Sequence, residues 1–351
     1  MVSRAGGKQV RIGWLDTAQG LAILIVVLGH VLGGLIDSPV GSHAPPMRMA
    51  FLAIYSFHMP VFFLLSGLLV EDRLARGRTA FLSSLVPTII WPYFLWSVVQ
   101  LLMIYSIGSL ANRPVQSILP GLTGLPWKPV SQFWFLYALF WMHVAATLLT
   151  RRLGREGFVL MALAVKSLAL VIALPLAVRL VTGHMLFYAI GLWLGAGGVE
   201  RLVGGERPVL RALLLSGIAV AVIAVTMQAA PAYAPDIDVL TAGSPALANV
   251  AWRFPALAAA IAGVMALLAI ATAMGAGKEA NWLAWLGRRT MPIYLMHILF
   301  IAGGRIALVR LGMGGNPYML ASVLWALGLV GPLVAYDICL RLRVAHLLGL
   351  R

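Results

Sequence analysis

The stretch WLDTAQGLAILIVVLGHVLGGLI (14–36) is almost entirely apolar and carries one charged side chain, Asp16. A helix needs about 20 mostly apolar residues to cross the roughly 30 Å hydrocarbon core of a bilayer, and this stretch is long enough. The rest of the chain has the same character: 61% of its residues are hydrophobic, 11% are charged, and the mean hydropathy is +0.94. Soluble domains carry about 25% charged residues. We therefore predict an all-α integral membrane protein.

Apolar segments of similar length recur to the end of the chain. They lie near 14–36, 47–70, 81–110, 132–150, 157–175, 178–198, 209–229, 248–275, 289–311 and 317–341. This pattern predicts a single transmembrane domain over residues 1–351, built as a bundle of about ten helices. The third segment is long, and Pro87 and Pro92 predict a tilt or a break there because proline interrupts the hydrogen bonds of a helix.

The charged residues predict how this bundle is oriented. If the N-terminus is cytoplasmic, eighteen of the 26 Lys and Arg residues fall in inner segments. The outer segments hold five: Arg48, Arg113, Lys128, Arg179 and Arg253. Basic residues are retained on the cytoplasmic side, so we expect a multi-pass protein of the inner (plasma) membrane with both termini in the cytoplasm. The net charge of +15 then reflects orientation, and we expect no nucleic-acid partner.

Three polar side chains of the first segment share one face of the predicted helix. At 100° per residue, Asp16, Gln19 and His30 fall within a stripe about 60° wide, and His30 lies about 21 Å further along the axis than Asp16. Ionisable groups inside a membrane are costly and commonly functional. Imidazole suits a general base, so we predict that His30 is catalytic. Asp16 is a second catalytic candidate, although a carboxylate there also suits a helix N-terminus.

Polar and aromatic residues of the other spans supply the remaining candidates. His58 lies two residues before Pro60, and Arg305 lies deep in its span, where it can bind a polar or anionic group. We assign substrate contacts to six side chains: His58, Trp134, Tyr137, Tyr294, His297 and Arg305. For Trp134 and Tyr137 the alternative is a role as aromatic anchors at the membrane interface. Ser66 and Gly67 are better explained by close helix packing, and His143 by a core role. The chain has one cysteine, Cys339, so a zinc site of several thiolates is excluded and we predict no metal.

Five motifs together resemble the acyltransferase 3 family of integral membrane acyltransferases, most closely its fucose 4-O-acetylase-like branch. They are WLDTAQGLAILIVVLGH (14–30), SFHMPVFFLLSGLL (56–69), PYFLW (92–96), FWFLYALF (133–140) and MPIYLMH (291–297). The resemblance covers essentially the whole chain. It implies a ten-helix core, an acyl-CoA donor (acetyl-CoA above all) taken from the cytoplasm, and an acceptor hydroxyl on a sugar or a lipid-linked glycan.

The sequence departs from the family pattern at two places. The family has a basic residue, ten residues and then a histidine; here His30 matches, but Gln19 stands at the basic position. The basic pair that precedes the proline of the third helix is also replaced by uncharged residues. We expect Gln19 to take part in holding the donor, with Arg73, Arg76 and Arg78, in the loop just before that helix, supplying the positive charge that anionic CoA requires.

These observations predict an O-acyltransferase in which His30 acts as general base on an acceptor hydroxyl. Two alternatives remain open from sequence alone. Polar stripes and interrupted helices are also typical of a transporter or flippase for a glycan or a small acid. The two missing basic elements are equally compatible with a non-catalytic relative of the acyltransferases.

Overall fold

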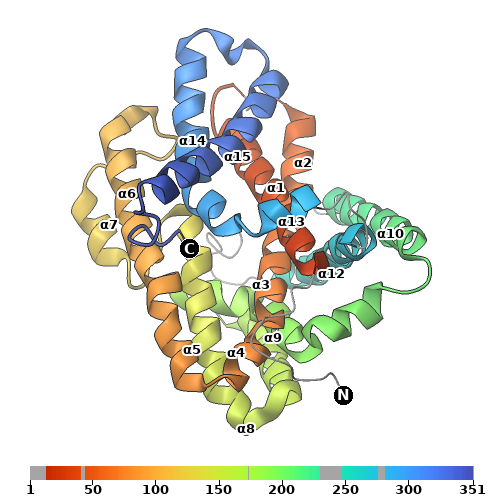
Figure 1. The fold of residues 1–351 in the computed structure, drawn as a ribbon. Coiled ribbons are helices and arrows are strands. Elements are labelled where there is room, and N and C mark those ends of the chain that lie inside the picture. Colours follow the sequence, from red (N-terminus) through yellow and green to blue (C-terminus); the bar gives the residue numbers. More distant parts are fainter. Residues whose placement is uncertain (1–12, 41–43, 173, 230–246, 276–280, 351) are drawn as a thin grey trace.

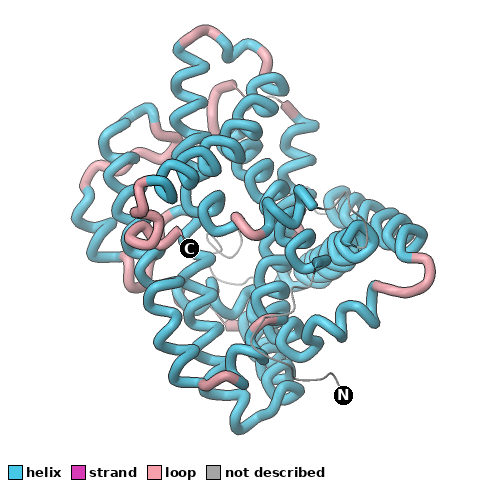
Figure 2. The backbone as a smooth tube through the Cα atoms, viewed as in Figure 1, coloured by secondary structure: helices cyan, strands magenta, loops and turns pink. Residues whose placement is uncertain are grey.

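The computed structural model describes residues 13–40, 44–172, 174–229, 247–275 and 281–350. This described part is helical and contains no β-strand (Figure 2). In chain order its elements are α1 (Gly13–Ile36), α2 (Pro45–Tyr55), α3 (His58–Leu68), α4 (Val70–Ala75), α5 (Arg78–Leu85), η1 (Val86–Ile90), α6 (Trp91–Ile107), η2 (Gly108–Leu110), α7 (Ile118–Gly124), η3 (Ser131–Phe133), α8 (Trp134–Val171), α9 (Leu176–Val203), α10 (Pro208–Ala229), α12 (Leu247–Gly275), α13 (Asn281–Gly287), α14 (Thr290–Arg310), η5 (Met313–Gly315) and α15 (Pro317–Arg341).

Nine helices of the described residues are long and apolar enough to cross a membrane, where the sequence predicted about ten. The difference arises in α8, whose 38 residues include both predicted spans 132–150 and 157–175. Gly154 lies between them with φ 70° and ψ −174°, which is not helical, so α8 is two helices joined at this glycine. Figure 1 shows the chain reversing direction there. Glycine suits the position because other residues rarely adopt positive φ.

Two predicted spans lose regular α-helical structure where proline removes a backbone donor. Residues 86–90, which include Pro87, form a π-helix between α5 and α6, and Pro92 follows in the first turn of α6, so the span is irregular where a tilt or break was predicted but remains helical. The segment predicted as one helix over 47–70 is divided into α2 and α3 at Ser56 and Phe57. Pro60 has no N–H to donate to the carbonyl of Ser56, so the helix cannot continue regularly through this point. The break places His58 at the start of α3.

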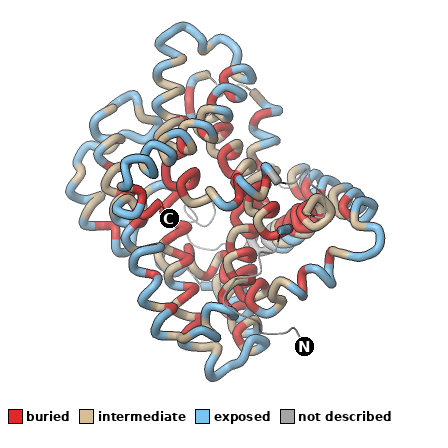
Figure 3. Tube along the Cα trace, viewed as in Figure 1, coloured by how far each residue is buried: buried red, intermediate tan, exposed pale blue. Residues whose placement is uncertain are grey.

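The core of the protein lies where α1 meets its neighbours. Helix α1 packs against α2, α3, α12, α13, α14 and α15, and its buried residues lie near the middle of Figure 3. A second close pair is α3 and α9. A Cβ atom added at Gly67 would overlap the backbone of Tyr188, and one added at Gly191 would overlap the backbone of Leu64. These glycines allow the two helices to approach backbone to backbone, in agreement with the packing role expected of Gly67.

Candidate functional site

A cavity of about 1390 Å³ lies beside α1. Gln19, His30 and Asp37 all line it, so it follows most of the length of this helix. Gln19 and Asp37 are 18 positions apart, which corresponds to about 27 Å at 1.5 Å per residue. Two members of the predicted polar stripe, Gln19 and His30, therefore face the same cavity.

The segment α2–α4 lines the cavity in the opposite direction. Arg48, in α2, lies at the same end as Asp37, His58 lies beside the middle, and Arg73 and Arg76 lie at the other end with Gln19. We call the two ends the α2 end and the α4 end. The α4 end is lined by two of the three arginines that the sequence assigned to the donor.

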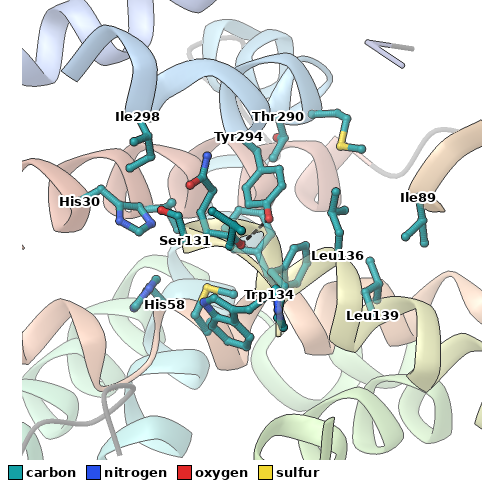
Figure 4. A pocket seen from close by; sticks show the side chains of 18 of the residues that line it. His30, His58, Ile89, Ser131, Trp134, Leu136, Leu139, Thr290, Tyr294 and Ile298 are labelled. Atoms are coloured by element: carbon teal, nitrogen blue, oxygen red, sulfur yellow. Dashed lines mark hydrogen bonds between the residues drawn. The ribbon is translucent and has the colours of Figure 1, made fainter. Parts of the chain in front are cut away.

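Histidine and aromatic side chains line the middle of the cavity, and Figure 4 shows His30 and His58 on one side with Trp134 and Tyr294 next to them. The hydroxyl of Tyr55 lies 3.4 Å from Nδ1 of His30, and the ring of Tyr55 lies 4.4 Å from that of His58, centroid to centroid. Nδ1 of His58 donates to the carbonyl of Ile54, at 3.0 Å. His30 and His58, predicted from sequence, thus come together through residues of α1, α2 and α3.

His297 lies behind His30 rather than in the cavity lining. Its Nδ1 is 3.0 Å from the carbonyl of Ile293 and 2.8 Å from that of Tyr294. A carbonyl only accepts, so Nδ1 carries the proton and Nε2 is an acceptor. Nε2 is buried and has no hydrogen-bond partner among the described residues. The rings of His297 and His30 lie 5.0 Å apart and are inclined by 46°, so this acceptor belongs to the surroundings of His30.

Residues of η3 and the start of α8 form another part of the cavity lining, and the sequence predicted only part of it. Ser131, Gln132 and Trp134 line the cavity there, and Ser131 adopts a positive φ of 48°. The hydroxyl of Tyr294 donates to the backbone carbonyl of Gln132, at 2.6 Å, which ties α14 to this turn (Figure 4). The side-chain amide of Gln132 donates to Gln100, at 3.0 Å. Trp134 and Tyr294, both candidates from the sequence, thus line the same cavity as His30.

The third arginine of the donor group does not line the cavity. Arg78 donates to the backbone carbonyl of Thr147 and contacts the hydroxyl of Thr150, so it joins α5 to α8. His143, assigned to the core from sequence, does line the α4 end. Its Nδ1 is 2.7 Å from the hydroxyl of Tyr188. The sequence signal for this pair is weak, because the two residues come from separate helices.

Asp16 lies outside the cavity lining, in contrast to the predicted stripe. Its carboxylate pairs with Arg288, with 3.2 Å between Oδ2 and Nη1. At 100° per residue Asp16 lies within about 60° of His30 around α1, but α13 packs against this first turn. A Cβ at Gly287 would overlap the backbone of Asp16, so the two segments are in direct contact. The carboxylate is therefore drawn to the neighbouring arginine.

Two further candidates also lie away from the cavity lining. The ring of Tyr137 packs against Tyr93 and Trp141, at centroid distances of 6.2 and 6.4 Å. Arg305 donates to the carbonyl of Leu110, at 3.2 Å, and so holds the turn that follows α6. The guanidinium of Arg305 thus has a backbone carbonyl as its partner. Its position within a span is explained by this contact and does not require a bound substrate.

Comparison with known proteins gives two relatives over part of the chain. Nodulation protein NolL of Mesorhizobium japonicum is 29% identical over 142 residues, which are 38% of this chain and 35% of the relative. Nodulation protein NolL of Sinorhizobium fredii is 28% identical over 152 residues, 42% of this chain and 38% of the relative. The chain thus spans little more than a third of the length of these curated relatives. No solved structure matches it.

The family comparison covers much more of the chain than either relative. The model of the acyltransferase domain matches residues 12–337, from the start of α1 to the last turn of α15. Both cavity ends and the histidine cluster lie within this range. The chain belongs to the acyltransferase 3 family.

Proposed function

We propose that this protein is a membrane-embedded O-acyltransferase that moves an acyl group, acetyl above all, from acyl-CoA to a hydroxyl of a sugar or a cell-surface glycan precursor. One observation carries the proposal: in a helical membrane protein of an acyltransferase family, one cavity joins a pair of arginines to a histidine cluster. Following the charge distribution of the sequence, the protein lies in the plasma membrane with both termini, and the α4 end, towards the cytoplasm.

The α4 end suits the donor because CoA carries several phosphate groups. Arg73 and Arg76 supply two guanidinium groups, which bind phosphate oxygens with fixed geometry. Gln19 of α1 lines the same end, and its side-chain amide can donate to a carbonyl or phosphate oxygen without adding charge. The thioester then extends from this end towards His30. Gln19 therefore positions the donor. Because glutamine replaces the basic residue that the family has at this position, the positive charge is supplied by Arg73 and Arg76, which follow α3.

Transfer at His30 follows from ordinary acyl chemistry. His30 takes the proton of the acceptor hydroxyl as that oxygen bonds to the thioester carbonyl carbon. The carbon–sulfur bond then breaks, and the departing thiolate takes the proton back from the imidazolium of His30, which leaves the ester and CoA thiol. A positioned base typically contributes about 10²–10⁴-fold. Direct transfer of this kind needs no covalent intermediate on Cys339, which lies outside the cavity lining.

His297 positions His30 in this scheme and does not contact substrate. Its Nε2 is a buried acceptor beside His30 and stabilises the N–H of the imidazolium that forms during transfer. A hydrogen bond to a charged group is worth about 1.5–3 kcal/mol. We expect His297→Asn, which keeps a donor for the carbonyls but loses this acceptor, to lower kcat about 10- to 100-fold.

The measurement is a steady-state comparison of His297→Asn and His297→Gln, whose longer amide reaches the Nε2 position. Recovery of kcat in His297→Gln, with the KM for acyl-CoA unchanged in both variants, supports the positioning role. Equal losses in both variants, together with lower melting temperatures, would mean that His297 only stabilises the fold.

Loss of the arginine pair should weaken donor binding. We expect Arg73→Gln together with Arg76→Gln to raise the KM for acetyl-CoA at least about tenfold, because two phosphate contacts are lost. The KM for the acceptor should change little. Arg341→Gln is the matched control, since Arg341 is exposed and pairs with Asp337 in its own helix. An unchanged KM for acetyl-CoA in the double variant would place the donor elsewhere.

The function itself is tested by mass spectrometry of surface glycans from cells with and without the gene, together with CoA release by purified protein in lipid nanodiscs. The proposal requires O-acyl esters that depend on the gene and CoA release that depends on an acceptor sugar. Glycan that accumulates on one side of the membrane without any change in esters would instead identify a transporter. Unchanged esters and no CoA release would identify a non-catalytic relative.

A further inference from the structure

The cavity lining outside the α4 end carries three basic residues that the donor does not explain. Arg48 and Arg113 line the α2 end, and Lys128 lines the wall between α7 and η3. Asp37 is the acidic residue that lines the cavity among the described residues, and it pairs with Arg113, with 3.4 Å between Oδ2 and Nη2. Two of these three positive charges therefore remain uncompensated by the lining.

The sequence makes this group unusual. Only five basic residues fall in predicted outer segments, because positive charge is disfavoured on that side of a plasma membrane. Three of these five line one cavity, although they come from α2, from the turn after η2 and from the turn before η3. The loop that bears Arg113 is fixed in place, because Asn112 donates to the carbonyl of Gly34 at 2.8 Å. The fold thus directs these charges to one cavity.

A path lined by aromatic rings leads from Arg48 to His30. Arg48, Phe51 and Tyr55 lie at spacings of three and four on one face of α2, and all three line the cavity. Arg48 and Tyr55 are seven residues apart, which is about 10 Å along the helix. Tyr55 in turn contacts His30. A sugar ring can lie against these aromatic faces while its anionic group meets the cations.

We propose that the acceptor is an anionic glycan: one carboxylate or phosphate binds Arg48 and Arg113 at the α2 end, about 10 Å from the hydroxyl that His30 activates, and a second meets Lys128 on the wall before η3. This proposal rests on the proposed function and adds the chemical class of its acceptor. The separation corresponds to about two linked sugars, or to one sugar and a phosphodiester. Diphosphate groups at the α4 end and an anion at the α2 end together account for the cations at both ends of the cavity.

The test compares binding of two disaccharides that differ in charge alone: α-1,4-linked digalacturonic acid and the matching galactose disaccharide. Binding to the full chain in phosphatidylcholine nanodiscs, without acetyl-CoA, is measured by calorimetry. The acidic disaccharide should bind at least about tenfold more tightly at low salt, and the difference should shrink as NaCl screens the charges. Equal affinity for the two, or no binding of either at millimolar concentration, would overturn the proposal.

Variants assign the selectivity to the named residues. Exposed charge contacts are individually weak, so Arg48→Gln and Lys128→Gln should each reduce the preference for the acidic disaccharide about two- to fivefold, and the double variant about tenfold. Arg310→Gln is the control, because Arg310 is an exposed cation in the last turn of α14, outside the cavity lining. An unchanged preference in the double variant contradicts the proposal. Because the readout is a ratio, partial misfolding does not imitate the result.

Two further measurements identify the bound anion and distinguish failure of the acceptor site from failure of the proposed function. Nanodiscs that contain phosphatidylglycerol should leave the preference unchanged; its loss there would mean that lipid phosphate is the anion that these residues bind. Selective binding without acetyl transfer from acetyl-CoA to either disaccharide would overturn the proposed function and leave the anionic ligand site standing.

Discussion

Replacement of His30 by alanine is expected to abolish O-acylation by this protein, with a loss of at least about 10²-fold in kcat, because general base catalysis contributes about 10²–10⁴-fold. The side chain lines the middle of the cavity, between the donor end and the acceptor end. No other described histidine combines a place in the lining with the neighbouring acceptor of His297. The measurement is the amount of O-acetyl ester on surface glycan, supported by acceptor-dependent CoA release from purified protein.

The control for this variant is His346→Ala. His346 is exposed in the C-terminal segment and does not line the cavity, so its loss should leave ester levels unchanged. Equal amounts of both variants in the membrane exclude a trivial loss of protein. If the His30→Ala strain makes as much O-acetyl ester as the strain with the unmodified protein, the assignment of His30 as the base is refuted. A variant that binds acetyl-CoA normally but transfers no acetyl group supports the assignment.

Gly191→Ala is expected to destabilise the fold by about 1–3 kcal/mol, the usual cost of overpacking a tight contact. The added Cβ atom would overlap the carbonyl of Leu64, and backbone of a facing helix cannot move aside as a flexible side chain can. Helices α3 and α9 must then separate. Because α3 carries His58 and Ser66 to the cavity, activity should fall together with stability.

Melting temperature in detergent and the monodisperse fraction after solubilisation measure this effect. Gly67→Ala should behave in the same way, since its Cβ would meet Tyr188 from the other side of the contact. Gly217→Ala, in α10, has no atom within 4 Å of the added Cβ and should be neutral. Equal melting temperatures for Gly191→Ala and Gly217→Ala would show that the α3–α9 contact does not limit stability.

The residues themselves determined the class of the protein and much of its first helix. Hydropathy needs no tertiary information, because the bilayer sets the length of a spanning segment. Local chemistry also predicted an irregularity near Pro87 and Pro92, where a missing N–H acts within one turn. Helical periodicity placed Gln19 and His30 on a common face, and both line the cavity. Each of these predictions depends on neighbours in the chain.

Only the tertiary structure decided which distant segments contact each face of a helix. Periodicity gave Asp16 the same face as His30, but the contact with α13 and Arg288 takes it out of the cavity lining. The partner of His30 comes from α14, far later in the chain, and the basic residues that line the cavity outside the α4 end come from three separate segments. Helix packing depends on contacts between distant segments, so spacing along one helix cannot predict them.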